Sequence, residues 1–266
     1  MNNKIVMFDM DGTLTEPRQT FNSPELSQAL YRLTNSGVHV GIITGSDENY
    51  LREQMENFLK SASRYKIHLL PCNGTKYYRP PEFPQEDFKL THEVSMEEHL
   101  GSKSYRTLLF ELILSQVDMA NSDIPLTGHF INCRGSMINW CPIGRNAKTK
   151  ERDKFIDIDK RIGLRKRVIE ELKMMLKQKG LLNKLTIKFG GDTSFDIYPK
   201  GWDKTYGLKH FYGWDIWFVG DRTCANGNDY EIYEACSIKS QGFNSTGPLK
   251  TAKIIENIMI RMRGAE

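Results

Sequence analysis

Near its N-terminus this chain of 266 residues reads Ile5-Val6-Met7-Phe8-Asp9-Met10-Asp11-Gly12-Thr13-Leu14-Thr15. The apolar beginning of this stretch predicts a buried strand, and two carboxylates follow directly at its end. The glycine after them permits a sharp turn of the backbone. Two carboxylates at a strand end cannot both lose water without a cation, so the pair predicts a hard metal such as Mg²⁺. The alternative interpretation is an acidic turn that closes an edge strand.

The spacing of the two carboxylates suits phosphoryl transfer. Asp9 is expected to act as a nucleophile that forms an aspartyl-phosphate, and Asp11 to act as general acid and base at the same centre. Thr13 can offer a hydroxyl and an amide to a phosphate. The motif resembles the first motif of the haloacid dehalogenase (HAD) superfamily of phosphotransferases.

A second acidic cluster follows a later apolar run, Ile216–Val219. Asp221 stands where a third metal ligand is needed. Asp229 can hold the metal ligands in place without contacting the metal, or it can bind a second cation. Thr44, after the second expected strand, supplies a hydroxyl, and Lys204 can balance the charge of the nucleophile and the phosphate. Each of these residues alone is weak evidence, because loop acids and solvated lysines are common.

Composition excludes several classes of protein. The chain is 39% hydrophobic and 26% charged, which is typical of a globular protein with one large or two modest domains. No apolar run approaches a membrane span, and the N-terminus does not resemble a secretory signal. The five cysteines are odd in number and form no Cys-x-x-Cys pair, which indicates reduced thiols. We therefore expect a cytoplasmic protein with no membrane partner.

The net charge of +4 is unevenly distributed. The segment 146–189 holds fourteen Lys and Arg against six Asp and Glu, so the remainder of the chain is acidic. Solvated amphipathic helices explain most of these charges, and attraction of a phosphate ester is the functional alternative. The basic residues alternate with acids and no binding motif accompanies them, so we expect no nucleic-acid partner.

Strands and helices alternate at both ends of the chain, which predicts a doubly wound parallel sheet with its site at the carboxyl ends of the strands. The middle of the chain breaks this pattern with antiparallel strands beside helices. We therefore expect a core domain of residues 1–86 and 200–266, with an α+β cap domain over 87–199. The expected core elements are strands Ile5–Phe8, Val38–Ile43, Ile67–Leu70, Ile216–Val219 and Ser237–Lys239, and helical segments Ser23–Ser36, Asp47–Lys60, Asp229–Glu234 and Leu249–Met262.

The expected cap begins after a stiff connector, Pro80–Pro84, and the stretch 75–91 resembles nothing familiar. Its expected elements are helices Tyr105–Met119, Lys150–Asp159 and Arg165–Lys179, and strands Gly128–Cys133, Met137–Pro142, Leu185–Phe189 and Ser194–Tyr198.

Longer stretches resemble one family of the HAD superfamily, the eukaryotic-type α-phosphomannomutases. They span nearly the whole chain in the same order, which makes them more specific than the superfamily motifs. They are Thr15-Glu16-Pro17-Arg18-Gln19, Gly45-Ser46-Asp47 with Glu53-Gln54, the hairpin from Phe130 to Arg145, Glu151-Arg152, the segment Ser194 to Lys204, and Gly227-Asn228-Asp229-Tyr230-Glu231-Ile232.

The resemblance implies a Rossmann-like HAD core with an inserted α+β cap of type C2. It implies an isomerase that interconverts mannose 6-phosphate and mannose 1-phosphate through an aspartyl-phosphate and a hexose 1,6-bisphosphate, which also serves as activator. The product would supply GDP-mannose synthesis, and the protein would be a homodimer formed through the cap. Asp9, the Asp11 backbone carbonyl and Asp221 would hold Mg²⁺. The substrate-binding residues would be Arg18, Arg134, Arg145, Arg152, Ser194 and Asp196.

Some residues depart from the family pattern. Cys133 and Cys141 stand in the hairpin where other residues are expected, Arg134-Gly135-Ser136 replaces Arg-Asn-Gly, and Cys224-Ala225-Asn226 replaces a run rich in proline and glycine. These departures leave the sugar preference open. The alternative functions are a sugar-phosphate phosphatase, a mutase that prefers glucose phosphates, and an inactive sugar-phosphate sensor. The intact Asp9, Asp11, Asp221 and Lys204 argue against the sensor.

Overall fold

The computed structural model describes residues 3–264 of the chain. The chain divides into two compact units: Met1–Glu93 with Trp202–Glu266, and Val94–Gly201. The second unit is therefore inserted between two parts of the first.

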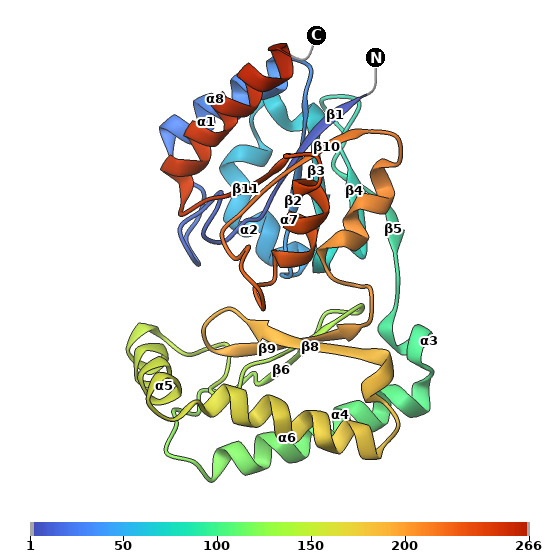
Figure 1. Cartoon of the computed structure of the whole chain (residues 1–266), viewed down its shortest axis with the longest axis vertical. Helices are drawn as coiled ribbons and strands as arrows, with labels where there is room; N and C mark the ends of the chain where they lie inside the picture. The colour runs from blue at the N-terminus through green and yellow to red at the C-terminus, as the bar shows by residue number, and fades with distance from the viewer. Residues whose placement is uncertain (1–2, 265–266) are drawn as a thin grey trace. The chain divides into compact units, whose positions relative to one another are not determined.

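The first unit is built on a sheet with the strand order β11-β10-β1-β2-β3-β4-β5 (Figure 1). Neighbouring strands from β11 to β3 are parallel, whereas β4 and β5 are added antiparallel at the edge. The strands are β1 (Lys4–Phe8), β2 (His39–Ile43), β3 (Ile67–Leu70), β4 (Lys76–Arg79), β5 (Lys89–Glu93), β10 (Asp215–Gly220) and β11 (Gly242–Asn244).

The alternation of side chains along β1 assigns the two faces of this sheet. Val6 and Phe8 belong to one apolar cluster, whereas Ile5 and Met7 belong to another. Helices α1 (Pro24–Asn35), α2 (Glu48–Leu59) and α8 (Pro248–Gly264) bury their apolar faces in the first cluster. Helix α7 (Tyr230–Ser237) and the 3₁₀ segment η4 (Lys204–Phe211) contribute to the second. In Figure 1, α1 and α8 lie side by side. Both faces of β1 are buried, as expected for a central parallel strand.

Two expectations for the core are corrected by the structure. The segment Ser237–Lys239 is not a strand, because Ser237 is the last residue of α7 and the strand β11 begins at Gly242. The connector Pro80–Pro84 does not lead into the second unit, because it joins β4 to β5, which are both strands of the first-unit sheet. The sheet is thus mixed at one edge, and the first unit extends to Glu93 before the insertion begins.

The second unit contains an antiparallel sheet with the strand order β6-β7-β9-β8, and α4 and α6 pack side by side (Figure 1). The aromatic side chain of Phe195 on β9 is fully buried and packs 5.0 Å from the ring of Trp140. The elements are α3 (Met96–Leu100), α4 (Ser102–Ala120), β6 (Ile131–Cys133), β7 (Ile138–Trp140), α5 (Thr149–Ile162), α6 (Leu164–Gln178), β8 (Leu185–Gly190) and β9 (Ser194–Pro199).

The remaining short 3₁₀ segments are η1 (Ala62–Lys66), η2 (Cys72–Gly74) and η3 (Leu182–Lys184). Among the described residues, no helix is both long and apolar enough to cross a bilayer.

Candidate active site

The parallel strands of the first unit place three of the predicted site residues at one edge of the sheet. Asp9 follows β1, Thr44 follows β2, and Asp221 follows β10. The amide of Asp9 donates to the carbonyl of Val219 at 2.9 Å, which continues the pairing of β1 with β10 beyond the strand end. Because the carboxyl ends of parallel strands meet at the same edge, this is where an open α/β sheet binds its ligand.

Lys204 joins two carboxylates in the interior of this site. Its Nζ donates to Oδ1 of Asp9 and, at 2.5 Å, to Oδ1 of Asp229. Lys204 is 1% exposed, Asp9 4% and Asp229 0%, so this ion triad is shielded from water. Removal of one member would leave an uncompensated buried charge, which is strongly destabilising.

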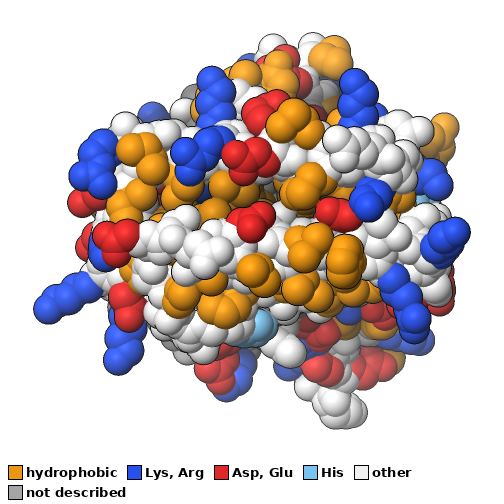
Figure 2. Space-filling view, turned by 90° about the horizontal axis from the view of Figure 1, so that it is seen from below, with side chains coloured by type: hydrophobic (Ala, Val, Ile, Leu, Met, Phe, Trp, Pro, Cys, Tyr) orange, Lys and Arg blue, Asp and Glu red, His pale blue; other side chains and the backbone are white. Residues whose placement is uncertain are grey.

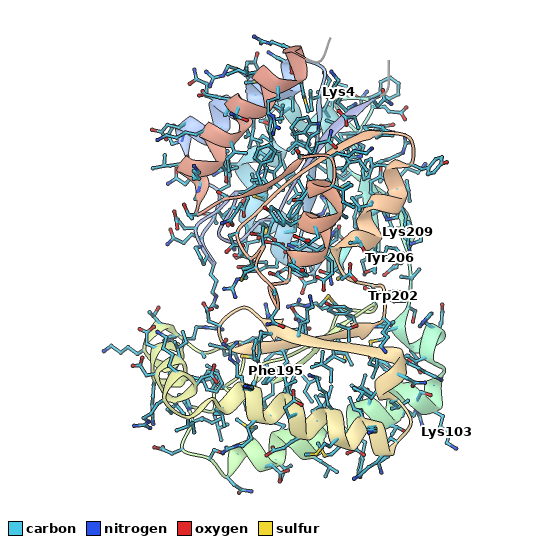
Figure 3. The ribbon with its side chains drawn as sticks, viewed as in Figure 1. Lys4, Lys103, Phe195, Trp202, Tyr206 and Lys209 are labelled. Atoms are coloured by element: carbon cyan, nitrogen blue, oxygen red, sulfur yellow. The ribbon has the colours of Figure 1, made fainter. Side chains whose placement is uncertain are left out.

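The segment that carries Lys204 is itself fixed. Figure 3 labels Trp202, Tyr206 and Lys209 along it. The carbonyl of Trp202 accepts a hydrogen bond of 3.1 Å from Nδ2 of Asn73. The indole ring of Trp202 packs edge-on against the ring of Tyr206, with 5.9 Å between the ring centroids. The carboxylate of Asp203 caps the start of η4 by accepting from the amide of Thr205 at 2.9 Å. The lysine therefore approaches Asp9 from a rigid support.

Burial and like charge dominate the electrostatics of the carboxylates. Burial, followed by the nearby charge of Asp229, raises the pKa of Asp9 well above its ordinary value. The same two causes raise the pKa of Asp221 to about 6. Burial alone lowers the pKa of Lys204, but the carboxylates of Asp229 and Asp9 outweigh it and raise this pKa above its ordinary value. The lysine stays charged, and the carboxylates are crowded with negative charge.

The carboxylates fit a divalent cation. Asp9, Asp221 and Asp229 each offer an oxygen, and these oxygens lie within 4.8 Å of one another. Oδ2 of Asp229 already accepts from the amides of Asp221 at 3.1 Å and Arg222 at 3.0 Å. By contrast, Oδ1 of Asp221 is buried without a hydrogen-bond partner among the described residues, which suits a metal ligand.

Gly12 makes room for Asp221. It adopts φ +84°, and a Cβ at this position would collide with the carboxylate of Asp221. A side chain larger than hydrogen would therefore displace the carboxylate of Asp221, so the glycine of the first motif is required for the site and for its turn.

The Asp11 carboxylate has two partners that sequence reasoning did not find. Its Oδ1 accepts from the amide of Arg18 at 2.8 Å and from the hydroxyl of Tyr50 at 3.1 Å. The side chain of Arg18 is exposed, and its backbone has φ +64°. Tyr50 lies in α2 inside the stretch Gly45-Ser46-Asp47 to Glu53-Gln54, but its spacing alone gave no sign of a link to Asp11.

Thr44 is buried, and its hydroxyl accepts a hydrogen bond of 3.1 Å from the amide of Ser46. The amide of Asn73 donates to the carbonyl of Thr44 at 2.8 Å. These bonds fix the turn after β2, from which the Thr44 side chain can support a bound phosphate.

The other predicted substrate residues belong to the second unit, where Asn139 links several of them. Nδ2 of Asn139 donates to Oγ of Ser194 at 3.1 Å and to Oδ1 of Asp196 at 2.7 Å, and its Oδ1 accepts from Arg145 at 3.0 Å. The buried Asn139 faces Asp196 across the β7–β9 pairing. Sequence reasoning missed Asn139, although it lies in the quoted hairpin.

Arg152 and Arg134 complete this set. Nη1 of Arg152 donates to Oγ1 of Thr193 at 2.7 Å, and its Nη2 donates to the carbonyl of Arg145 at 3.4 Å. Arg134 is 7% exposed and lies at the turn between β6 and β7, where its amide donates to the carbonyl of Met137 at 2.8 Å. The bonds of Arg152 hold its guanidinium in a fixed position, from which it can bind a phosphate.

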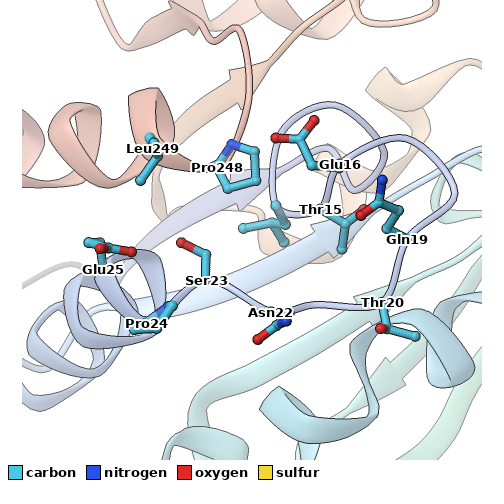
Figure 4. A pocket seen from close by; sticks show the side chains of 11 residues that line it. Thr15, Glu16, Gln19, Thr20, Asn22, Ser23, Pro24, Glu25, Pro248 and Leu249 are labelled. Carbon is cyan, nitrogen blue, oxygen red and sulfur yellow. The ribbon is translucent and has the colours of Figure 1, made fainter.

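A hollow of about 240 Å³ adjoins the loop that carries Arg18 (Figure 4). It lies beside the first turns of α1 and α8, and the carboxylates of Glu16 and Glu25 are among its lining groups. None of the predicted catalytic, metal or substrate residues lines it. Its negative charge does not suit a phosphate ester, so the strand-end site remains the candidate active site.

Comparison with known proteins identifies the family. The family model described as eukaryotic phosphomannomutase matches residues 26–261. The chain belongs to this family. The matched range begins after Asp9 and Asp11, so the assignment of these two residues depends on the motif and on the geometry above.

Individual relatives agree with the family. The chain is 36% identical to a phosphomannomutase of Solanum lycopersicum over 94% of this chain and 91% of that protein. It is 37% identical to a phosphomannomutase of Arabidopsis thaliana over 92% of each.

Solved structures show the same fold at low sequence identity. A Plasmodium falciparum IMP-nucleotidase mutant with bound IMP has a TM-score of 0.66 at 14% identity, covering 97% of this chain and 67% of that one. An Aspergillus fumigatus trehalose-6-phosphate phosphatase has a TM-score of 0.53 at 16% identity, covering 96% and 92%. The HAD-type fold predicted from the sequence is confirmed.

Proposed function

We propose that the protein is a phosphomannomutase, an isomerase that interconverts mannose 6-phosphate and mannose 1-phosphate and supplies GDP-mannose synthesis. The buried Asp9, paired with Lys204 at the carboxyl edge of the sheet, is the observation that carries this proposal within the phosphomannomutase family. A binding protein or sensor has no need of a nucleophile held in this way.

The chemistry assigned to the first unit has two half-reactions. In the first, the oxygen of Asp9 that does not face Lys204 attacks phosphorus, and the bond between phosphorus and the sugar oxygen breaks. The departing sugar oxygen takes the proton of Asp11. In the second, Asp11 removes the proton of an incoming sugar hydroxyl. This oxygen attacks phosphorus, and the electron pair of the breaking bond returns to Asp9. Transfer from phosphorylated Asp9 to a hexose monophosphate gives the 1,6-bisphosphate, which reverses its orientation and returns its other phosphate.

A divalent cation, which we propose is Mg²⁺, would be held by Asp9, Asp221 and the backbone carbonyl of Asp11. When bound, it supplies positive charge that offsets the carboxylates and the phosphoryl group. Lys204 holds one oxygen of Asp9 in place, and Asp229 holds Lys204 and the backbone after Asp221. Thr44 is assigned to the transferring phosphate.

We assign recognition of the sugar and of the phosphate that is not reacting to Arg18 and to the second-unit residues Arg134, Arg145, Arg152, Ser194 and Asp196. Guanidinium groups bind phosphate through paired hydrogen bonds, and the carboxylate and hydroxyl suit sugar hydroxyls. The bonds of Asn139 to Ser194, Asp196 and Arg145 support this assignment, because they hold three of these side chains in a fixed arrangement.

We also propose a cytoplasmic homodimer. Helix α4 exposes Phe110, Ile113, Leu114 and Val117, each at least 41% exposed, in an i, i+3, i+4, i+7 stripe. Figure 2, which views the molecule from below Figure 1, shows hydrophobic side chains gathered among charged ones. A helix that buries one face and exposes another apolar stripe is suited to pack against a second copy of itself.

The decisive experiment separates isomerisation from hydrolysis. Purified protein with Mg²⁺ and a catalytic trace of hexose 1,6-bisphosphate is given mannose 1-phosphate or glucose 1-phosphate, and the 6-phosphates and free phosphate are both measured. We expect mannose 6-phosphate in large excess over free phosphate, and no turnover by Asp9→Asn. Free phosphate as the main product would favour a phosphatase, faster turnover of glucose 1-phosphate would favour a glucose-biased mutase, and activity in a folded Asp9→Asn variant would refute the nucleophile.

A further inference from the structure

Two hydrogen bonds hold the carboxylate of Asp11, and both end on the same oxygen. The amide of Arg18 and the hydroxyl of Tyr50 both donate to Oδ1, at 2.8 and 3.1 Å. These bonds leave Oδ2 as the oxygen that can exchange a proton with a substrate. The orientation of Oδ2 therefore depends on what fixes Oδ1.

Of these two donors, Tyr50 has the more rigid support. It occupies the third position of α2, where its amide donates to the carboxylate of Asp47, the helix cap, at 3.0 Å. Its ring is partly buried and packs against the apolar cluster between α1, α2, α8 and the sheet. The donor of Arg18, by contrast, belongs to an exposed loop. The hydroxyl of Tyr50 thus connects Asp11 to the packed interior of the first unit.

We propose that Tyr50 is a positioning residue that holds the Asp11 carboxylate so that Oδ2 faces the oxygen of the leaving or incoming sugar. This inference rests on the proposed role of Asp11 as acid and base. A phenol is a neutral donor, so it can orient the carboxylate without adding a charge beside it. A small error in the placement of a proton donor is costly to rate, because general acid–base catalysis requires hydrogen-bond contact.

The role of Tyr50 predicts a dependence on the leaving group. A sugar phosphate leaves as an alkoxide that needs a proton, whereas p-nitrophenyl phosphate leaves as a stable phenolate that does not. Tyr50→Phe keeps the ring and removes the hydroxyl. We expect the mutase kcat to fall about 3- to 10-fold with KM unchanged, as loss of one hydrogen bond allows. The first-turnover release of p-nitrophenolate, which precedes any use of Asp11 as a base, should be unchanged.

The matched control is Tyr78→Phe. The hydroxyl of Tyr78 donates to Glu48, also in the first turn of α2, but has no bond to Asp11. We expect this variant to keep both rates. Thermal unfolding of each variant is compared with that of the parent protein, so that a loss of folded protein is not taken for a loss of rate.

Asp11→Asn separates this inference from the proposed function. We expect it to lose the mutase reaction and to keep the first-turnover release of p-nitrophenolate. Tyr50→Phe should add no further loss in the Asp11→Asn background, because no proton is left to position. Equal losses on both substrates in Asp11→Asn would remove the acid–base role, and the inference with it. A selective loss in Asp11→Asn, combined with no effect, a uniform effect or a rate increase in Tyr50→Phe, would refute the inference alone.

Discussion

At the scale of single residues, the candidate site depends on pairing of buried charge. The ammonium charge of Lys204 offsets the carboxylate charges of Asp9 and Asp229, which are buried away from water. Asp221 retains an oxygen with no hydrogen-bond partner among the described residues. The second unit pairs its polar groups in the same manner, since Asn139 connects Ser194, Asp196 and Arg145. In both units a buried polar group fixes side chains that are suited to bind a ligand.

Arg145→Ala tests the substrate assignment at this scale. We expect a loss of about 10- to more than 100-fold in mutase kcat/KM, because a charge-assisted contact to phosphate is worth about 1.5–3 kcal/mol. Hydrolysis of a small aryl phosphate, which has no second phosphate, should change little. The control is Arg167→Ala, because Arg167 is exposed in the same unit and forms a loose ion pair of 3.8 Å with Glu171. Equal losses on both substrates would mean that Arg145 supports the fold or the core site.

At the scale of secondary-structure elements, neighbouring strands of the core carry a histidine pair, of which His68 is buried and His39 partly buried. Nδ1 of His39 on β2 lies 2.9 Å from Nε2 of His68 on β3, and Nδ1 of His68 lies 2.8 Å from the hydroxyl of Tyr77 on β4. Burial, followed by the charge of His39, lowers the pKa of His68 to about 3. The pair therefore links parallel and antiparallel parts of the sheet in its neutral form.

This pair predicts an acid-sensitive fold. In the unfolded chain His68 takes a proton near pH 6.5, but in the folded protein only near pH 3, so its contribution is present above pH 6.5 and is lost as pH falls below it. We expect the free energy of unfolding to fall by up to about 1.4 kcal/mol per pH unit from this group. Urea unfolding between pH 7 and pH 4 should show a shallower slope for His68→Gln than for the parent protein or the exposed control His99→Gln. Identical slopes would contradict the assignment.

At the scale of the whole molecule, the chain builds two units with separate interiors, one on a mostly parallel sheet and one on an antiparallel sheet. The first holds the proposed reacting groups and the second most of the proposed substrate residues. The apolar stripe on α4 is the feature of the second unit that suits contact with a second copy of the chain.

Phe110→Glu tests the proposed dimer. By size-exclusion chromatography with light scattering, we expect the parent protein at twice its chain mass of 30.7 kDa, and the variant to dissociate with a dimer constant weakened about tenfold or more. Ile260→Glu changes an exposed isoleucine of α8 in the other unit and should leave the dimer intact. A monomeric parent protein, or a dimer that is unaffected by Phe110→Glu, would contradict the interface.

The sequence by itself determined those features that depend on local pattern. Apolar runs that end in Asp9, Thr44 and Asp221 predicted that these residues share one edge of a parallel sheet, because strand direction fixes which ends meet. Local pattern was misleading where it was weak. The expected strand Ser237–Lys239 contains a single apolar residue and belongs to the end of a helix and the turn after it, and β4 and β5 carry polar residues that hid an edge pairing.

Only the tertiary structure decided which distant groups pair. Lys204 and Asp9 are 195 positions apart, and Tyr50 and Asp11 are 39 apart, so no spacing along the chain encodes either contact. Asn139 likewise finds its partners across a strand pairing. These contacts form because a buried charge or polar group must be satisfied by whatever the fold brings within reach, and that choice is made in three dimensions.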